Sequence, residues 1–125
     1  MKLIVAGSRG FKDYDFLCST LDKFLEEHKG EDIEFISGAA TGADTMGGIY
    51  ATDHGYNLKE FPAQWEVYGR SAGYIRNSAM LKYACSDENP VLFAFWDGQS
   101  HGTAHIIKEA EKLFMEVHVC TSEEV

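Results

Sequence analysis

Two short apolar runs in the sequence constrain the fold more than any other feature. Lys2–Ala6 is apolar from its second residue onward, and Val91–Trp96 consists of six apolar residues in a row. Each run is too short to be a membrane span, and each is followed by turn-forming residues, so each is predicted to be a strand buried on both faces. Such strands are typical of the centre of a parallel sheet that helices cover on both sides.

Segments predicted to be helical alternate with short strands along the chain. The helices are predicted at 13–28, 43–54, 72–85 and 103–114, and three further strands at 33–37, 58–61 and 116–120. Residues 62–70 are predicted to form a loop rich in large aromatic side chains. Strict alternation of strand and helix predicts an α/β fold, here a Rossmann-like three-layer sandwich around a parallel five-stranded sheet.

The polarity of the strands predicts their order in the sheet. The first and fourth strands are apolar throughout and therefore central, whereas the third and fifth carry charged or polar side chains such as Lys59 and Glu116 and suit the edges. This gives the order 3-2-1-4-5. The chain then changes direction between strands one and four, and open α/β sheets bind ligands outside the carboxyl ends of their strands at such a switch point.

Length and composition limit the class of protein. The 125 residues fit a single domain, predicted to cover 1–121, with a short polar tail at 122–125. The three cysteines include no CxxC pair, which favours a reducing compartment and hence the cytoplasm, and no apolar run is long enough for a membrane anchor. The net charge of −9 disfavours a surface that tracks a nucleic-acid backbone, although it permits a small anion bound by backbone N–H groups.

Three loops rich in glycine, serine and threonine are predicted to meet at the switch point. They are Gly7–Phe11, Gly38–Asp44 and Asp97–Thr103. Glycines let a backbone approach a phosphate closely, and helix starts such as Gly102-Thr103 present free N–H groups. Each loop also has a purely structural interpretation, in which Arg9 is a surface cation, Asp44 complements a helix dipole and Thr103 is an N-cap.

Several side chains outside these loops are candidates for the same crevice. Trp65 and Tyr68 are predicted to contact a base or another subunit, whereas Trp96 is predicted to pack in the core. Arg70 and Arg76 either reach the crevice or lie on a solvated helix face.

Two catalytic arrangements are disfavoured by their spacing. His101 and His105 are four residues apart, but no HExxH motif or companion cysteine accompanies them, so no metal site is predicted. Ser8 with a histidine and Asp97 lacks the GxSxG elbow of a hydrolase triad.

Five motifs occur in order and resemble those of the SLOG superfamily. They are Gly7-Ser8-Arg9-x-Phe11, Ser37-Gly38-x-x-x-Gly42-Ala43-Asp44, Pro62-Ala63-x-Trp65-x-x-Tyr68-Gly69, Ala72-Gly73-x-x-Arg76-Asn77-x-x-Met80 and Ala94-Phe95-Trp96-Asp97-Gly98-x-Ser100-x-Gly102-Thr103. The chain is most similar to the short YspA/YpsA-related branch of bacteria and their phages, over residues 3 to about 110.

The resemblance implies a Rossmann-like domain that binds a nucleotide or a nucleotide-derived molecule, such as one related to ADP-ribose or NAD. It also implies a homodimer or larger homo-oligomer. No cofactor is predicted, and the protein is expected in the cytoplasm of a bacterium or a phage-infected host. Relatives include the LOG phosphoribohydrolases, which remove the base from a nucleoside monophosphate, and DprA, which binds single-stranded DNA.

The chain departs from the LOG enzymes at two positions. Arg76 matches their arginine, and Met80 matches a nearby position of the same motif. In contrast, Asn77 replaces a basic residue and Ile106 replaces the glutamate. An alkyl side chain cannot transfer a proton, so LOG-type hydrolysis is put in doubt.

The sequence therefore predicts a protein that senses or sequesters a nucleotide derivative. An N-glycosidase with Arg76 and Asp44 as catalytic candidates is the alternative, and single-stranded DNA binding is disfavoured by the acidic charge. The residues predicted to contact the ligand are Gly7, Ser8, Arg9, Phe11, Ser37, Gly38, Gly42, Asp44, Trp65, Tyr68, Arg76, Asn77, Asp97, Gly98, Ser100, Gly102 and Thr103.

Overall fold

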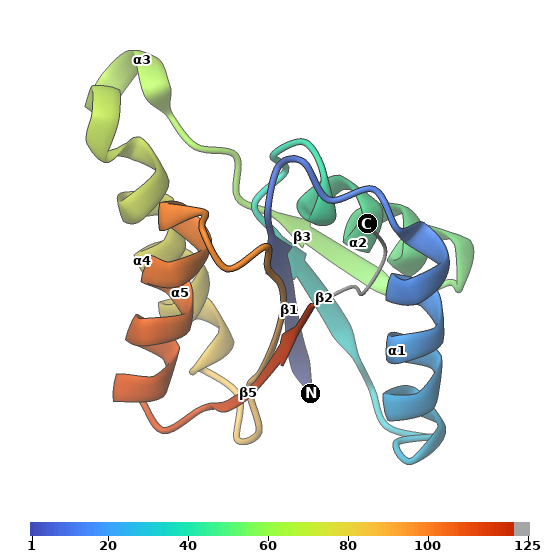
Figure 1. The fold of residues 1–125 in the computed structure, drawn as a ribbon. Coiled ribbons are helices and arrows are strands. Elements are labelled where there is room, and N and C mark those ends of the chain that lie inside the picture. The colour runs from blue at the N-terminus through green and yellow to red at the C-terminus, as the bar shows by residue number, and fades with distance from the viewer. Residues whose placement is uncertain (122–125) are drawn as a thin grey trace.

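A computed structural model describes residues 1–121; the predicted tail at 122–125 lies outside the described residues. Strands and helices alternate as predicted (Figure 1). The strands are β1 (Lys2–Gly7), β2 (Glu34–Ser37), β3 (Asn57–Glu60), β4 (Val91–Phe95) and β5 (Glu116–Cys120). The helices are α1 (Tyr14–Glu26), α2 (Ala43–Asp53), α3 (Trp65–Tyr68), the 3₁₀ helix η1 (Gly69–Ser71), α4 (Ala72–Ala84) and α5 (His101–Lys112).

The five strands form one parallel sheet in the order β3-β2-β1-β4-β5. In the register, Ile4 of β1 lies between Ile36 of β2 and Leu92 of β4. The predicted fold class and strand order are confirmed. The order in which successive strands are added to the sheet reverses after β3, where the chain crosses to the other side of β1 to form β4. Because β1 and β4 are adjacent and parallel, their carboxyl ends open side by side.

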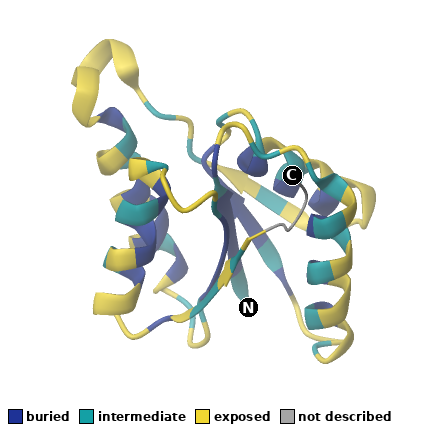
Figure 2. Ribbon diagram, viewed as in Figure 1, coloured by how far each residue is buried: buried dark blue, intermediate teal, exposed yellow. Residues whose placement is uncertain are grey.

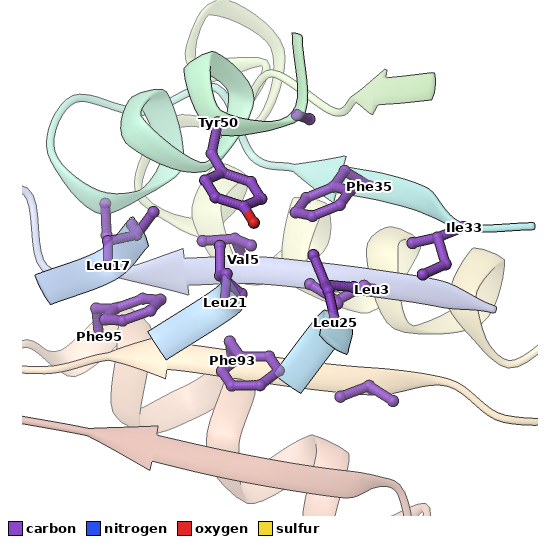
Figure 3. Packing of buried hydrophobic residues seen from close by; sticks show 13 residues of the cluster. Leu3, Val5, Leu17, Leu21, Leu25, Ile33, Phe35, Tyr50, Phe93 and Phe95 are labelled. Carbon is purple, nitrogen blue, oxygen red and sulfur yellow. The ribbon is translucent and has the colours of Figure 1, made fainter. Parts of the chain in front are cut away.

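Each face of the sheet is covered by a pair of helices. Alternate residues of β1 point to opposite faces, so Leu3 and Val5 pack in the core under α1 and α2, whereas Ile4 and Ala6 pack under α4 and α5 (Figure 1). The first core contains Leu17, Leu21 and Leu25 of α1 facing aromatic side chains of β2, β4 and α2 (Figure 3). All five residues of β4 are buried, as expected for a central strand.

Glycine allows α2 to lie close to the sheet. A Cβ atom added at Gly47 would lie only 2.6 Å from the side chain of Val5, so no larger residue fits without a shift. This contact explains why a helix interior contains a residue that lowers helix stability by about 1 kcal/mol relative to alanine.

The predicted loop at 62–70 contains α3 and η1 instead of irregular chain. These elements project beyond the carboxyl ends of the strands, and α3 has no buried residue (Figures 1 and 2). A four-residue helix is too short to show a periodic apolar pattern, which is why the sequence does not predict it. The predicted bounds of the last helix are also wrong, because α5 begins at His101 and ends at Lys112.

Among residues 1–121, no helix is both long enough and apolar enough to cross a lipid bilayer.

Candidate functional site

The three glycine-rich loops meet around a cavity of about 390 Å³ at the carboxyl ends of the strands, here called the switch-point cavity. Its walls come from the loops after β1, β2 and β4, from α3 and α4, and from the first turns of α5. They are formed by Ala6, Gly7, Arg9, Gly10, Ala40, Asp44, Trp65, Arg70, Gly73, Tyr74, Arg76, Asn77, Met80, Ser100, His101, Gly102, Thr103 and Ile106.

Contacts through Ser8 hold the loops after β1 and β4 together. The N–H of Ser8 donates to the carbonyl of Phe95 at 2.9 Å, and its buried hydroxyl accepts the N–H of Asp97 at 3.0 Å and the hydroxyl of Ser100 at 3.1 Å. Gly7 permits this approach, since an added Cβ would lie 2.2 Å from the Phe95 carbonyl oxygen. Ser8 thus fixes the cavity wall from behind.

The loop after β2 packs directly against the loop after β1. Gly42 has a φ of +82°, and an added Cβ would lie 2.4 Å from the carbonyl oxygen of Ser8. The same oxygen accepts the N–H of Ala43 at 3.3 Å. Both the backbone conformation and the close approach require glycine at this position.

Asp44 is a nearly buried carboxylate in the cavity wall, with 4% of its surface exposed. Its Oδ2 accepts the N–H of Ala40 at 3.3 Å and lies 4.0 Å from Nη1 of Arg76. Burial raises the pKa of Asp44 to about 6, although Arg76 and the backbone N–H groups oppose the rise. The carboxyl can therefore bind or release a proton close to neutral pH.

Arg76 connects α4 to the loop after β2. Its Nη1 donates to the carbonyl of Gly38 at 2.5 Å, and its Nε donates to Oδ1 of Asn77 at 3.0 Å. Burial lowers the pKa of Arg76 from its ordinary value, and the positive charge of Arg9 acts in the same direction while Asp44 opposes it. The guanidinium is thus fixed in place before any ligand arrives.

Asn77 links Arg76 to the start of α5. While its Oδ1 accepts from Arg76, its Nδ2 donates to the carbonyl of Gly102 at 3.1 Å and lies 3.2 Å from Nδ1 of His105. One buried amide thereby sets the position of the guanidinium relative to the helix terminus.

The amino end of α5 faces the cavity. Ser100 occupies the N-cap position, and the N–H groups of the first helical residues, which include Gly102 and Thr103, have no acceptor within the helix. Asp97 accepts the N–H groups of Gln99 and Ser100 at 2.8 Å each, which starts the helix before Thr103. The alternative in which Thr103 is the N-cap is therefore wrong.

Aromatic side chains border the cavity on the side of α3 and α4. Trp65 is 48% exposed, and the Arg9 guanidinium lies 5.5 Å from its ring centroid. Tyr74, which sequence reasoning missed, also lines the cavity, and its ring centroid lies 4.5 Å from that of His105. Trp96 packs against the core under α4 and α5, which confirms its predicted structural role. Its Nε1–H also donates to the carbonyl of Ser100.

A second, smaller cavity of about 270 Å³ adjoins the first. It shares Arg9, Ala40, Trp65 and Arg76 with the switch-point cavity. Its remaining walls belong to the loop after β2 and to the segment after β3, and are Gly38, Ala39, Thr41, Pro62 and Ala63.

The residues predicted to contact a ligand thus fall into two groups. Those that line a cavity are Gly7, Arg9, Gly38, Asp44, Trp65, Arg76, Asn77, Ser100, Gly102 and Thr103. Those that line neither cavity are Ser8, Phe11, Ser37, Gly42, Tyr68, Asp97 and Gly98.

Most of the second group support the first. Phe11 packs on the ring of Phe95, with centroids 5.3 Å apart, and the hydroxyl of Ser37 donates to the Asp44 carbonyl at 2.9 Å. Tyr68 lies on α3 with 46% of its surface exposed. Arg70, which the sequence left open between a crevice and a solvated surface, lines the switch-point cavity.

Two further features limit the chemistry of the cavity. Ile106, at the position where the resemblance to the LOG enzymes implies a glutamate, contributes apolar wall, as does Met80. Within residues 1–121, no group of three or more His, Cys, Asp or Glu side chains is placed to hold a metal ion.

The fold and the site together define a Rossmann-like domain with a cavity of mixed charged and apolar lining at the switch point of its sheet. Residues 1–68 match the model of the YspA, cpYpsA-related SLOG family. The chain is also 31% identical over 117 residues to the Gene 61 protein of Mycobacterium phage D29, with 89% of each chain covered. The chain therefore belongs to the YspA, cpYpsA-related SLOG family, as the motifs predicted. No solved structure matches the chain.

Proposed function

We propose that the switch-point cavity binds the phosphate of a nucleotide or a nucleotide-derived molecule, such as one related to ADP-ribose or NAD, so that the protein senses or sequesters it. One observation carries this proposal. The chain contains three arginines, Arg9, Arg70 and Arg76, and all three line this cavity, whereas none of its eight lysines does. Planar guanidinium groups suit phosphate better than lysine ammonium groups do.

The concentration of arginine is notable because the chain as a whole has a net charge of −9. Arg70 and Arg9 are exposed, while Arg76 is held between Gly38 and Asn77. The amino end of α5 adds N–H groups and the positive end of its dipole to the same wall. A phosphate at this position would therefore meet both side-chain cations and backbone donors.

The remaining walls suit the other parts of a nucleotide. Asp44 offers carboxylate oxygens that can accept hydrogen bonds from ribose hydroxyls, as acidic residues do in dinucleotide sites. The half-exposed rings of Trp65 and Tyr74 provide flat apolar surface for a base.

A nucleotide N-glycosidase is the second candidate, and the position of Asp44 favours it. A carboxyl group with a pKa of about 6 in a ligand cavity is suited to proton transfer near neutral pH. Ile106 supports the binding function over this one, because it leaves the cavity without the glutamate of the LOG enzymes.

The cellular location and the oligomeric state of the protein are also part of this proposal. A phage relative is consistent with a bacterial or phage origin, and we expect the protein to act in the cytoplasm of a bacterium or an infected host. Exposed apolar side chains on α3, Val67 and Tyr68 among them, are suited to contact a second copy of the chain in a homo-oligomer.

Thermal-shift measurements test ligand binding. The melting temperature is expected to rise with AMP, ADP-ribose, NAD or a cyclic nucleotide in excess, because a ligand that binds only the folded state stabilises it. The rise should shrink in Arg70→Ala, whose exposed side chain has little part in folding, and should persist in Lys82→Ala on the exposed surface of α4. If none of these compounds raises the melting temperature, the proposal is contradicted.

Chromatography of nucleotides after incubation with the protein tests the enzymatic alternative. Release of free base by the wild type, and its loss in Asp44→Asn, would establish an N-glycosidase. Intact nucleotides after prolonged incubation with a protein that binds them would leave binding as the function.

A further inference from the structure

The two adjoining cavities share a wall that contains most of the positive charge of the site. Four residues line both cavities, and they are Arg9, Ala40, Trp65 and Arg76. Beyond this junction, the switch-point cavity extends toward α4 and α5, and the second cavity extends toward Pro62 and Ala63. An anion at the junction would therefore have open space on two sides.

The junction carries more positive charge than its acidic neighbour balances. Asp44 lies 4.0 Å from Arg76, but its burial disfavours the ionised form. The guanidinium of Arg9 is close enough to oppose the charge of Arg76, and it lies over the uncharged ring of Trp65. An anion with more than one charge would relieve this repulsion.

The volumes favour a ligand that enters both cavities. The switch-point cavity, at about 390 Å³, is near the lower end of the range for small-molecule sites, which begins at about 300 Å³. The second cavity, at about 270 Å³, is below that range on its own. A mononucleotide ends in its phosphate and fills one cavity only, whereas a molecule whose charged group is internal can extend into both.

We propose that the ligand is a diester of diphosphate, with its two phosphoryl groups at Arg9 and Arg76, a nucleoside in the switch-point cavity and a second substituent in the cavity beside Ala63. Each phosphoryl group of such a diester carries one negative charge, which matches the two guanidinium groups. This proposal rests on the nucleotide binding proposed above, and it assigns the second cavity as the subsite that distinguishes diphosphate diesters from mononucleotides.

Isothermal titration calorimetry with three defined compounds tests the assignment. ADP-ribose is expected to bind the wild type about tenfold or more tightly than AMP, since it alone of the two can fill both cavities. A dinucleoside monophosphate, which has an internal phosphate with a single charge, is expected to bind more weakly than ADP-ribose.

Substitution at Ala63 separates the two cavities. Ala63→Trp should fill the second cavity and bring the affinity for ADP-ribose down to that for AMP, which itself should stay within about twofold of the wild type. Ala63→Ser, which adds little volume, should keep the preference for ADP-ribose. The melting temperature without ligand verifies that both variants are folded.

Three results would overturn the two-cavity assignment. They are equal affinity of the wild type for AMP and ADP-ribose, an undiminished preference for ADP-ribose in folded Ala63→Trp, and binding of the dinucleoside monophosphate as tight as that of ADP-ribose. In each of these cases nucleotide binding itself stands. A wild type that binds none of the compounds refutes nucleotide binding and the two-cavity assignment with it.

Discussion

Nη1 of Arg76 lies 4.0 Å from Oδ2 of Asp44, and the two side chains are only 12% and 6% exposed. This distance is too long for a hydrogen bond, and the closer partners of Arg76 are the carbonyl of Gly38 and the side chain of Asn77. Burial therefore outweighs the attraction of Arg76 and raises the pKa of Asp44, in contrast to the low pKa of a carboxylate in a tight salt bridge.

The raised pKa of Asp44 predicts that its ionisation destabilises the fold. The folded state holds the Asp44 proton up to a pH of about 6, whereas in the unfolded chain the carboxyl has its ordinary pKa of 3.8, so stability falls as pH rises between these values. Asp44→Asn, which stays uncharged, is expected to match the wild type near pH 4 and to exceed its free energy of unfolding by about 2 kcal/mol at pH 7.

Urea unfolding of both proteins from pH 4 to pH 8 measures this difference. A wild type that is more stable than Asp44→Asn at pH 7 would show that the carboxylate is stabilised in the fold. If Asp44→Asn is the more stable protein at pH 7, the ionised Asp44 carboxylate lowers the stability of the fold, as is typical of functional residues.

Gly38→Ala is predicted to displace Arg76. The added Cβ would lie 2.4 Å from Nη1 of Arg76 and 2.6 Å from Oδ2 of Asp44, so the guanidinium must move. The affinity for nucleotides is expected to fall about tenfold or more, with a loss of stability of about 1 kcal/mol from the weakened hydrogen bond to the Gly38 carbonyl.

Gly48→Ala is the matched control, because its added Cβ has the flexible end of Leu58 as its nearest contact, at 3.4 Å. It should leave the affinity unchanged and raise helix stability by up to about 1 kcal/mol. Unchanged affinity in Gly38→Ala would remove Arg76 from the binding site. Calorimetric titration and urea unfolding supply both readouts.

Asn77→Asp is predicted to disrupt the connection between α4 and α5. The carboxylate can still accept from Nε of Arg76, but it cannot donate to the carbonyl of Gly102 and would repel it. Stability at pH 7 is expected to fall by about 2 kcal/mol, as for other buried polar groups that lose a partner.

Asn57→Asp makes the same chemical change at an exposed position on β3 and should alter stability by no more than about 0.5 kcal/mol. Chemical denaturation at pH 7 compares the two variants. Equal, small effects would mean that the Asn77 amide has no structural role beyond that of a surface residue.

Phe114→Gly is predicted to stabilise the protein. Phe114 has a φ of +58° and is 95% exposed, and the bonds from Phe114 to Glu111 and from Met115 to Ala110 form a Schellman motif after α5. Glycine adopts this left-handed conformation without strain, so the gain in stability should be about 1 kcal/mol.

Phe114→Ala removes the exposed ring but keeps the Cβ atom, so it separates the effect of the backbone from that of the side chain. It should change the melting temperature much less than Phe114→Gly does. Equal increases in both variants would attribute the gain to the loss of the aromatic ring.

The strand order followed from the sequence because burial on both faces leaves a clear pattern. β1 and β4 are continuous apolar runs, and the polar residues Lys59 and Glu116 marked β3 and β5 as edges. The bounds of α5 were harder to predict, because they depend on the hydrogen bonds that Asp97 makes within its own loop. Thr103 and Ser100 are both chemically suited to an N-cap, so composition alone does not distinguish them.

The loops of the site were predictable, but the roles of individual residues within them were not. Glycine spacing marks where the backbone must turn, yet it does not show that the Ser8 hydroxyl faces Asp97 and Ser100 behind the cavity wall. Tyr74 lies in a helix, where an exposed aromatic side chain gives no signal of its neighbours. Its contribution to the cavity appears only when α4 and α5 are placed side by side.

The most direct test of the proposed site is a titration of the ¹⁵N-labelled protein with AMP, followed by amide chemical shifts. The largest shifts are expected on the amides of Gly7–Gly10, Ala40–Asp44 and Ser100–Thr103 together, at one common dissociation constant. Shifts confined to another face of the molecule, or no shifts at millimolar AMP, would contradict the proposed site.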